Sequence, residues 1–229
     1  MKRIPEDILE LANYGMPEAS VYLHVPLTTL RYWTLGTTSE RPLVKLAAVR
    51  PKPLLSFKNL VECYVLEVMR LSHGVNVRNI RYSLKTALDK YPSPHPFADD
   101  TISTRGNHVY LDDNLLVDLS RGGQLVFREF LASSLRRVDR DKLGLAKRLY
   151  PFMQKKEMLQ AQREASRTVV IDPAVSFGMP VLANSRISTS FLASRYRGGD
   201  SILALARDYG RQEGEIEEAL IWERAKQAA

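Results

Sequence analysis

The sequence contains one cysteine and four histidines in 229 residues, which limits its metal and redox chemistry. With Cys63 alone, no disulfide and no site of several thiolates can form within one chain. Cys63 lies in an apolar stretch, residues 59–69, so we favour a buried structural thiol. A metal- or redox-sensing cysteine is the second interpretation. The histidines are scattered without metal-ligand spacing. We therefore expect no metal and no cofactor.

Long apolar runs are also missing. None approaches the ~18 residues that a membrane-spanning helix needs. Residues 1–7 are charged and lack the apolar region of a secretory signal. Because hydrophobic residues still make up 45% of the chain, it can bury real cores. We expect a globular, cytoplasmic protein that makes no contact with membranes.

The signatures of common enzymes are absent as well. Asp99–Asp100 follows a proline-rich break and Asp112–Asp113 falls in an expected turn, so neither pair is placed as a buried acid/base couple. Gly122–Gly123 is not followed by the Gly-Lys-Ser/Thr of a phosphate loop, and no nucleophile elbow occurs. We expect that the protein is not an enzyme.

Residues 17–33 have the pattern of two short helices joined by a tight turn. Residues 19–23 place apolar side chains at helical spacing, and Pro26 can begin a second helix that runs through Trp33. On that helix Leu27 and Leu30 share one face with Thr34, which is suited to packing. The opposite face carries Thr28, Thr29 and Tyr32, with Arg31 on the flank. The pattern fits a helix-turn-helix or an ordinary helical hairpin.

The net charge of +7 is concentrated around this motif. Residues 25–90 hold eleven basic and four acidic side chains, whereas eight basic residues match eight acidic ones from residue 166 onward. Such a basic window is expected of a protein that binds the phosphate backbone. The residues that we expect at double-stranded DNA are Thr28, Thr29, Arg31, Tyr32, Lys45, Arg50, Lys52, Lys58 and Arg78.

The segment after the helix pair, residues 36–56, is rich in Gly, Thr, Ser and Pro and favours a two-stranded wing over a linker. Helices are predicted over residues 56–71 and 77–90. The motif Thr29-Leu30-Arg31-Tyr32-Trp33, with Ser56-Phe57-Lys58-Asn59-Leu60, Gly74-Val75 and Asn79-Ile80-Arg81, resembles MerR-type winged helix-turn-helix domains over residues 10–91. Two features depart from that family. The wing motif is reduced to Leu54-Leu55-Ser56-Phe57, and residues 91–96 interrupt the position of the dimerisation helix.

The rest of the chain reads as a mixed middle segment and a second helical bundle. Hairpins are predicted at residues 109–117 and 136–150, a helix at 124–135 and a polar linker at 152–166. A short strand at residues 169–171 precedes a helix ending near residue 197, a second over 202–208 capped by Asp200 or Ser201, and a third over 213–226. The third should bury Ile216, Ala219 and Leu220 and expose Glu215, Glu218 and Glu223.

The fold class expected from these patterns is mainly α with small β-hairpins. We expect a winged helix-turn-helix domain (1–95), a mixed α+β middle segment with a linker (96–166) and a helix-turn-helix-like three-helix domain (167–229).

Residues 168–225 resemble the small domain family of unknown function DUF 433. The resemblance rests on Asp172-Pro173, Gly178-Met179-Pro180-Val181, Ser185-Arg186-Ile187, Gly199-Asp200-Ser201 and Tyr209. Phe177 and Asn184 replace glycines usual in that family, and Gly210 replaces a proline.

The resemblance implies an antitoxin, because such domains are commonly encoded beside a PIN-like ribonuclease toxin, and those with a MerR-like domain resemble VapB-type antitoxins. Such a protein would neutralise the toxin and bind operator DNA to repress its own operon, as a homodimer or a toxin–antitoxin hetero-oligomer. The candidate residues for binding the toxin are Arg195, Arg197, Trp222, Arg224 and Lys226, with Trp222 either an interface anchor or a core residue. The alternative is a MerR-like transcription regulator that senses a small ligand through residues 97–165 and has no toxin partner.

Overall fold

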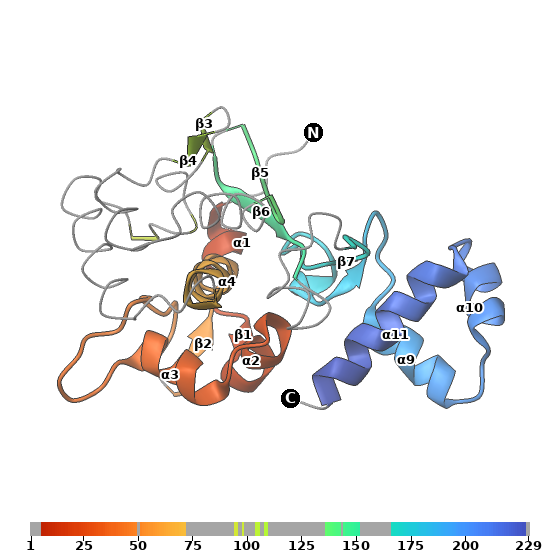
Figure 1. Ribbon diagram of the computed structural model, residues 1–229, viewed down its shortest axis with the longest axis horizontal. Coiled ribbons are helices and arrows are strands. Elements are labelled where there is room, and N and C mark those ends of the chain that lie inside the picture. The colour runs from red at the N-terminus through yellow and green to blue at the C-terminus, as the bar shows by residue number, and fades with distance from the viewer. Residues whose placement is uncertain are drawn as a thin grey trace.

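The computed structural model describes residues 6–49, 51–71, 94–95, 98, 104–105, 108–109, 136–142, 144–151 and 166–227. Over these residues the protein is mainly α-helical with small two-stranded antiparallel sheets (Figure 1), which confirms the predicted fold class. Of the helices in this part of the chain, none combines the length and the apolar character needed to cross a membrane.

The amino-terminal bundle is built around the predicted helix pair. Its elements are α1 (Glu6–Glu10), β1 (Tyr14–Gly15), α2 (Met16–Leu23), α3 (Leu27–Leu35), β2 (Leu54–Leu55) and α4 (Phe57–Leu71). The inward face of α3 is sealed, since Leu30 and Trp33 are fully buried. β1 pairs antiparallel with β2, and this pair joins the start of α2 to the start of α4.

The turn between α2 and α3 depends on one left-handed residue. His24 ends α2 with φ = 54°, and the next N–H, that of Val25, donates to the Ser20 carbonyl at 3.0 Å. This geometry reverses the chain within three residues. Pro26 stands immediately before α3, where the lack of an N–H leaves no helical hydrogen bond unmade.

Helix α4 is the centre of the bundle, with α1 on one side and α2 and α3 on the other (Figure 1). Ser56 and Asn59 cap its start reciprocally: each side-chain oxygen accepts the other residue's backbone N–H at 3.2 Å. Every residue from Phe57 to Met69 is buried. Cys63 is among them, which confirms the buried thiol, and burial raises its pKa.

The middle segment contributes two hairpins. β3 (Thr104–Arg105) pairs with β4 (His108–Val109), and β5 (Val138–Arg140) pairs with β6 (Ala146–Leu149) as predicted for residues 136–150. Of the predicted 109–117 hairpin only Val109 is described, and it pairs with Thr104. The predictions for residues 77–90, 124–135 and 152–165 lie outside the described residues.

The carboxyl-terminal domain begins with a strand pair and ends with three helices, as predicted. Its elements are β7 (Val169–Val170), the 3-10 turn Ser176–Gly178, β8 (Val181–Leu182), α9 (Thr189–Arg197), α10 (Ile202–Tyr209) and α11 (Glu213–Gln227). Ser201 caps α10 by accepting the Ala204 N–H at 3.1 Å. Leu192, Leu205 and Ile216 form the centre of the small core that holds these helices together.

The strands of this last domain contact both the β5–β6 hairpin of the middle segment and the core of the amino-terminal bundle. Leu149 and Ile171 exchange backbone hydrogen bonds of 3.0 and 2.9 Å, so the end of β6 pairs with the residue after β7. Ile171 and Trp222 lie in the same apolar core as α2 and α4. The carboxyl-terminal domain is therefore packed into the first core through its strands and its last helix.

Candidate nucleic-acid interface and partner surface

The outward face of α3 is open to solvent. Thr28 and Arg31 are exposed, and Thr29 and Tyr32 are half-buried. The Tyr32 hydroxyl donates to the Glu40 carboxylate, which fixes the ring beside the loop that follows α3. α3 therefore presents two threonines and an arginine outward, as predicted for a helix that meets a DNA groove.

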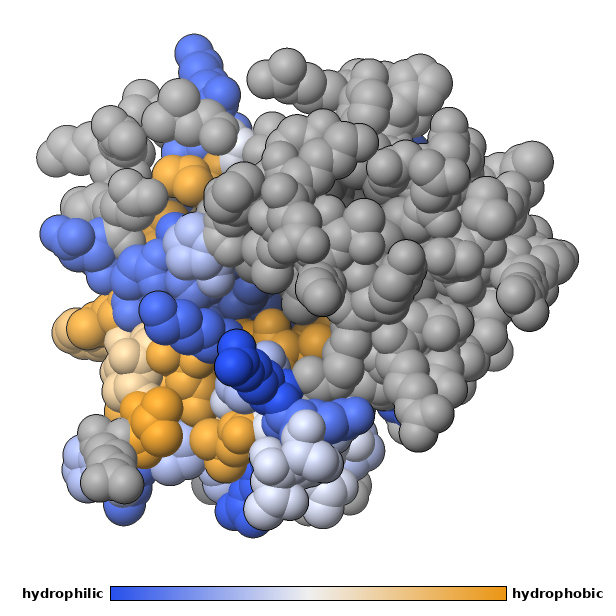
Figure 2. Space-filling model, turned by 90° about the vertical axis from the view of Figure 1, so that its left-hand side faces the viewer, coloured by the Kyte–Doolittle hydropathy of each residue, from blue (hydrophilic) through white to orange (hydrophobic). Residues whose placement is uncertain are grey.

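The segment after α3 returns as a very short hairpin. The Leu54 N–H donates to the Ala48 carbonyl at 2.9 Å, and the exposed Lys52 lies between these two residues. Lys45 is exposed on the approach to this hairpin, whereas Arg50 lies outside the described residues. On the side of the molecule where this loop lies, hydrophilic and hydrophobic side chains are interspersed (Figure 2). The single bridge between Ala48 and Leu54 lies in the segment for which a two-stranded wing was predicted, and the wing itself stays a prediction.

Lys58 is not where we expected it. Its side chain is only 5% exposed and its Nζ lies 2.8 Å from Oε1 of Glu10. Lys58 is the second residue of α4, and both it and its neighbours in the chain are buried. The half-buried carboxylate of Glu10 neutralises its charge. The expectation that Lys58 contacts phosphate is therefore wrong. Arg78 lies outside the described residues.

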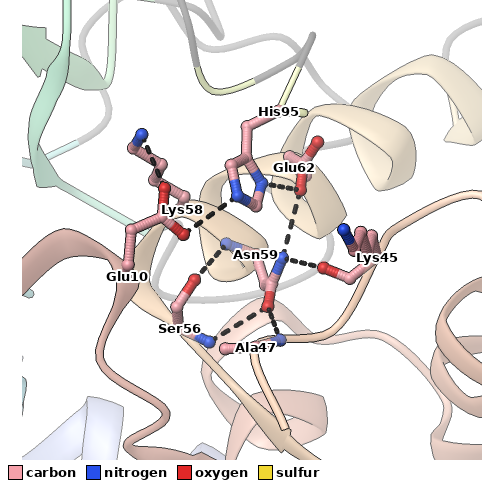
Figure 3. A network of polar contacts seen from close by, with 8 residues as sticks. All are labelled: Glu10, Lys45, Ala47, Ser56, Lys58, Asn59, Glu62 and His95. Carbon is pink, nitrogen blue, oxygen red and sulfur yellow. Dashed lines mark hydrogen bonds and ion pairs between the residues drawn. The ribbon is translucent and has the colours of Figure 1, made fainter. Parts of the chain in front are cut away.

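Lys58 belongs to a buried polar network that sequence reasoning missed (Figure 3). His95 lies between two carboxylates, with Nδ1 3.0 Å from Glu62 and Nε2 3.0 Å from Glu10. Asn59 donates to Glu62 at 3.2 Å and to the Lys45 carbonyl at 2.8 Å. The network ties α1 and α4 to the loop that precedes the hairpin.

The network favours the charged forms of His95 and Glu10. Burial lowers the pKa of His95, but the hydrogen bond to Glu62 and the charges of Glu62 and Glu10 outweigh it, so the pKa is raised. Burial likewise opposes ionisation of Glu10, but Lys58 and His95 hold its pKa below the ordinary value. Among the described residues, no three His, Cys, Asp or Glu side chains are grouped so that they could hold a metal ion. The arrangement is suited to a structural role, holding α1, α4 and the loop before the hairpin together.

Arg195, a candidate for toxin binding, is engaged inside its own domain. Its guanidinium bonds to Asp200 at 2.6 Å, to Asp208 at 2.8 Å and to the Tyr209 hydroxyl at 3.0 Å. The hydrogen bonds to Tyr209, Asp200 and Asp208 raise the pKa of Arg195. This arginine fastens α9 to α10. Arg197 and Arg224 are exposed, and the side chain of Lys226 lies outside the described residues.

Trp222 is a core residue. Its side chain is 2% exposed, and its ring centroid lies 6.2 Å from that of Tyr22 and 5.9 Å from that of His24. The last helix therefore packs directly on the turn between α2 and α3. The interpretation of Trp222 as an anchor for another protein is wrong, and the core interpretation is correct.

The acidic face of α11 is smaller than predicted. Glu223 is buried and accepts the Thr189 hydroxyl at 2.6 Å, because α9 packs against this end of α11. Glu215 and Glu218 are half-buried; Arg211 lies 2.5 Å from Glu215, and Ser166 donates to Glu218. The prediction that all three face solvent was wrong for Glu223, whereas Ile216, Ala219 and Leu220 are buried as predicted.

Comparison with known proteins identifies the carboxyl-terminal segment. Residues 169–222 match the family described as "Protein of unknown function (DUF433)", so the chain carries a DUF433 domain, as the sequence pattern indicated. Over 90% of its length the chain is 28% identical to "Putative antitoxin VapB45" of Mycobacterium tuberculosis, of which 92% is covered. Its fold is similar to the crystal structure of Rv2018 from Mycobacterium tuberculosis, with a TM-score of 0.69 and 25% identity over 92% of this chain and 98% of that one. The MerR-like character of residues 10–91 stays a prediction.

Two residues that stand where the resemblance led us to expect glycine have a left-handed backbone in this chain. Phe177 has φ = 54° and Asn184 has φ = 58°. Glycine adopts this conformation without steric cost, and asparagine tolerates it better than other residues with a Cβ. Phe177 therefore keeps a glycine-like backbone with an aromatic side chain on it.

Proposed function

We propose that this chain is the antitoxin of a toxin–antitoxin pair. In this proposal it neutralises a PIN-like ribonuclease toxin and binds operator DNA through α2 and α3 to repress its own operon. The observation that carries the proposal is the similarity, over 90% of the chain, to a protein named as an antitoxin. The open outward face of α3 and the DUF433 domain support the two halves of the proposed activity.

The DNA-binding half of the proposal rests on exposed cations beside α3. Arg31, Lys45 and Lys52 are exposed, and within the described part of the chain none of them is held in an ion pair. Each can neutralise one backbone phosphate and release its counterion. Thr28 and Thr29 would then meet the edges of bases or the sugar–phosphate chain. Arg50 and Arg78 remain further candidates from the sequence alone.

The toxin-binding half rests on the carboxyl-terminal domain. PIN-like nucleases are expected to gather carboxylates around their metal ion, and an inhibitor can place an arginine or lysine into such a cluster. Arg197 and Arg224 are exposed and can serve in this way, whereas Arg195 is already bound to two carboxylates. The assembly would be a homodimer of the chain or a hetero-oligomer with the toxin.

The proposal is tested by expressing the chain together with the protein encoded beside it, which the proposal expects to be a PIN-like ribonuclease. We expect a stable complex, suppressed ribonuclease activity, and operator binding whose affinity falls steeply between ~50 and ~200 mM salt. Unchanged ribonuclease activity in the presence of the chain would contradict the antitoxin role. DNA binding without any effect on the neighbouring protein would instead favour a transcription regulator that has no toxin partner.

A further inference from the structure

The backbone at residues 176–178 is held in an unfavourable conformation. Ser176, Phe177 and Gly178 have φ values of 48°, 54° and 75°, so three consecutive residues are left-handed. Only the glycine adopts this conformation freely, because a Cβ there crowds the backbone. Such strain persists only where surrounding structure imposes it, and it is concentrated at functional sites.

The surrounding structure does impose it. The Met179 N–H donates to the Ser176 carbonyl at 3.1 Å, and the Asn13 side-chain amide donates to the Phe177 carbonyl. A Cβ added at Gly178 would lie 2.0 Å from the Tyr14 hydroxyl oxygen, so the loop presses against β1. The loop is therefore fixed to the amino-terminal bundle, and its direction in space is set.

The result of this geometry is an aromatic ring that points into solvent. Phe177 is 84% exposed, and Met179, two residues on, is 44% exposed. Phe177 and Met179, two residues apart on either side of the buried Gly178, thus form one exposed apolar edge of the carboxyl-terminal domain, named here the Phe177 edge.

The chemistry of this edge suits a protein and not a nucleic acid. Residues 173–185 contain no charged side chain, although 26% of the whole chain is charged. A phosphate backbone needs cations, whereas the centre of a protein interface is poor in charge and rich in aromatic and methionine side chains. Phe177 and Met179 supply at most a few hundred Å² of apolar surface, since a whole aromatic ring buries ~150–250 Å².

The size of the edge distinguishes between two possible protein partners, a second copy of the chain and a different protein. Homodimer interfaces are larger and more apolar than the ~800 Å² per partner of a standard contact. A few hundred Å² matches the anchor of a contact between different proteins, where one or two aromatic side chains fill a pocket. We propose that Phe177 is the anchor with which this chain holds its toxin, the ring entering an apolar pocket of that protein. This inference rests on the proposed function.

The test uses the full chain and the toxin that the proposed function expects, purified as the product of the neighbouring gene. Phe177→Gly relieves the backbone strain and removes the anchor, so we expect an equal or higher melting temperature together with at least tenfold weaker toxin binding. Phe177→Trp keeps a large ring and should retain binding to within a few-fold. Leu203→Ala removes another exposed apolar side chain, 54% exposed on α10, and should leave toxin binding unchanged.

Three outcomes would overturn the inference, and they differ from one another. If Phe177→Gly binds the toxin as tightly as the unmodified chain does, Phe177 is not the anchor. The proposed function would still stand. A change in the oligomeric state of the chain alone, with no change in toxin affinity, assigns the edge to a second copy. Absence of toxin binding by the unmodified chain overturns the proposed function as well.

Discussion

The two helical bundles of this chain share a design of short helices and tight turns, yet they differ in charge: residues 25–90 hold eleven basic and four acidic side chains, whereas eight basic residues match eight acidic ones from residue 166 onward. In the amino-terminal bundle Arg31, Lys45 and Lys52 extend into solvent, and no ion pair holds them within the described residues. In the carboxyl-terminal domain Arg195 and Arg211 are bound to carboxylates of their own domain, whereas Arg197 and Arg224 are exposed. Similar helical bundles can thus suit different partners through the balance of their surface charges.

The bundles also differ in what lies inside them. The first buries a polar network around His95 within a large apolar core, whereas the second has a small core around Leu192, Leu205 and Ile216. They are joined at Trp222, and the Leu149–Ile171 pair joins the second bundle to the β5–β6 hairpin, which contacts α4. The difference between them is therefore one of surface and interior chemistry within a single folded body.

The largest expected effect comes from breaking the joint between the bundles. Trp222→Ala removes a buried ring that packs on Tyr22 and His24, and we expect a loss of ~3–5 kcal/mol in the free energy of unfolding. Urea denaturation measures this loss. Leu203→Ala, at an exposed site of the same domain, is the control and should change it little. A loss equal to that of the control would show that the two bundles are not coupled through Trp222.

The next effect sharpens the contrast in the interiors. Because the pKa of His95 is raised, protonated His95 stabilises the folded state. This contribution to the free energy of unfolding is fully present below the ordinary pKa of about 6.5 and is lost as pH rises through the raised value. We expect the urea midpoint to fall over this range. His95→Gln should cost ~1–3 kcal/mol at pH 6 and flatten the pH profile. An identical pH profile for His95→Gln and the unmodified protein would refute this role.

The contrast in surface charge is tested by DNA binding. Arg31→Ala and Lys52→Ala should each weaken binding to all DNA sequences and lower the salt slope by about 1. Fluorescence anisotropy at several salt concentrations measures both quantities. Arg207→Ala, an exposed arginine on α10, is the matched control and should leave the slope unchanged. If affinity hardly changes between low and moderate salt, the phosphate-contact model is incorrect.

The smallest effect is expected at the paired arginine of the second bundle. Arg195→Ala removes the ion pairs to Asp200 and Asp208, which are near the surface and screened by solvent. We expect a small fall in melting temperature that shrinks further at high salt. The variant should bind DNA as the unmodified chain does. Weaker DNA binding would mean that this domain also contacts DNA.

Among the described α-helices, all but α1 could be predicted, because local signals agree with one another. Apolar spacing, the interruption at His24 and Pro26, and the caps at Ser56 and Ser201 all mark element boundaries within the residues concerned. The same periodicity predicted a core face of Leu27, Leu30 and Thr34 on α3, of which Leu30 and Thr34 are buried and Leu27 is half-buried; the burial of Trp33 was not predicted. These predictions need only the neighbouring sequence.

The candidate site was predicted less well where a residue's environment depends on distant segments. Lys58 reads as a surface cation until Glu10 is brought to it, and Glu223 reads as exposed until Thr189 packs beside it. The His95 network joins residues 10, 62 and 95, and no local pattern links them. Three-dimensional placement decides these charges, and the sequence alone carries no signal for it.

The exchange of hydrogen bonds between Leu149 and Ile171 has a practical consequence for dissection of the chain. A fragment beginning at residue 166 would lose the strand that Ile171 pairs with, leaving that backbone edge open to other molecules. It would also bare the indole of Trp222 to water. Such a fragment should bind other molecules non-specifically and self-associate. Toxin binding should therefore be measured with the intact polypeptide.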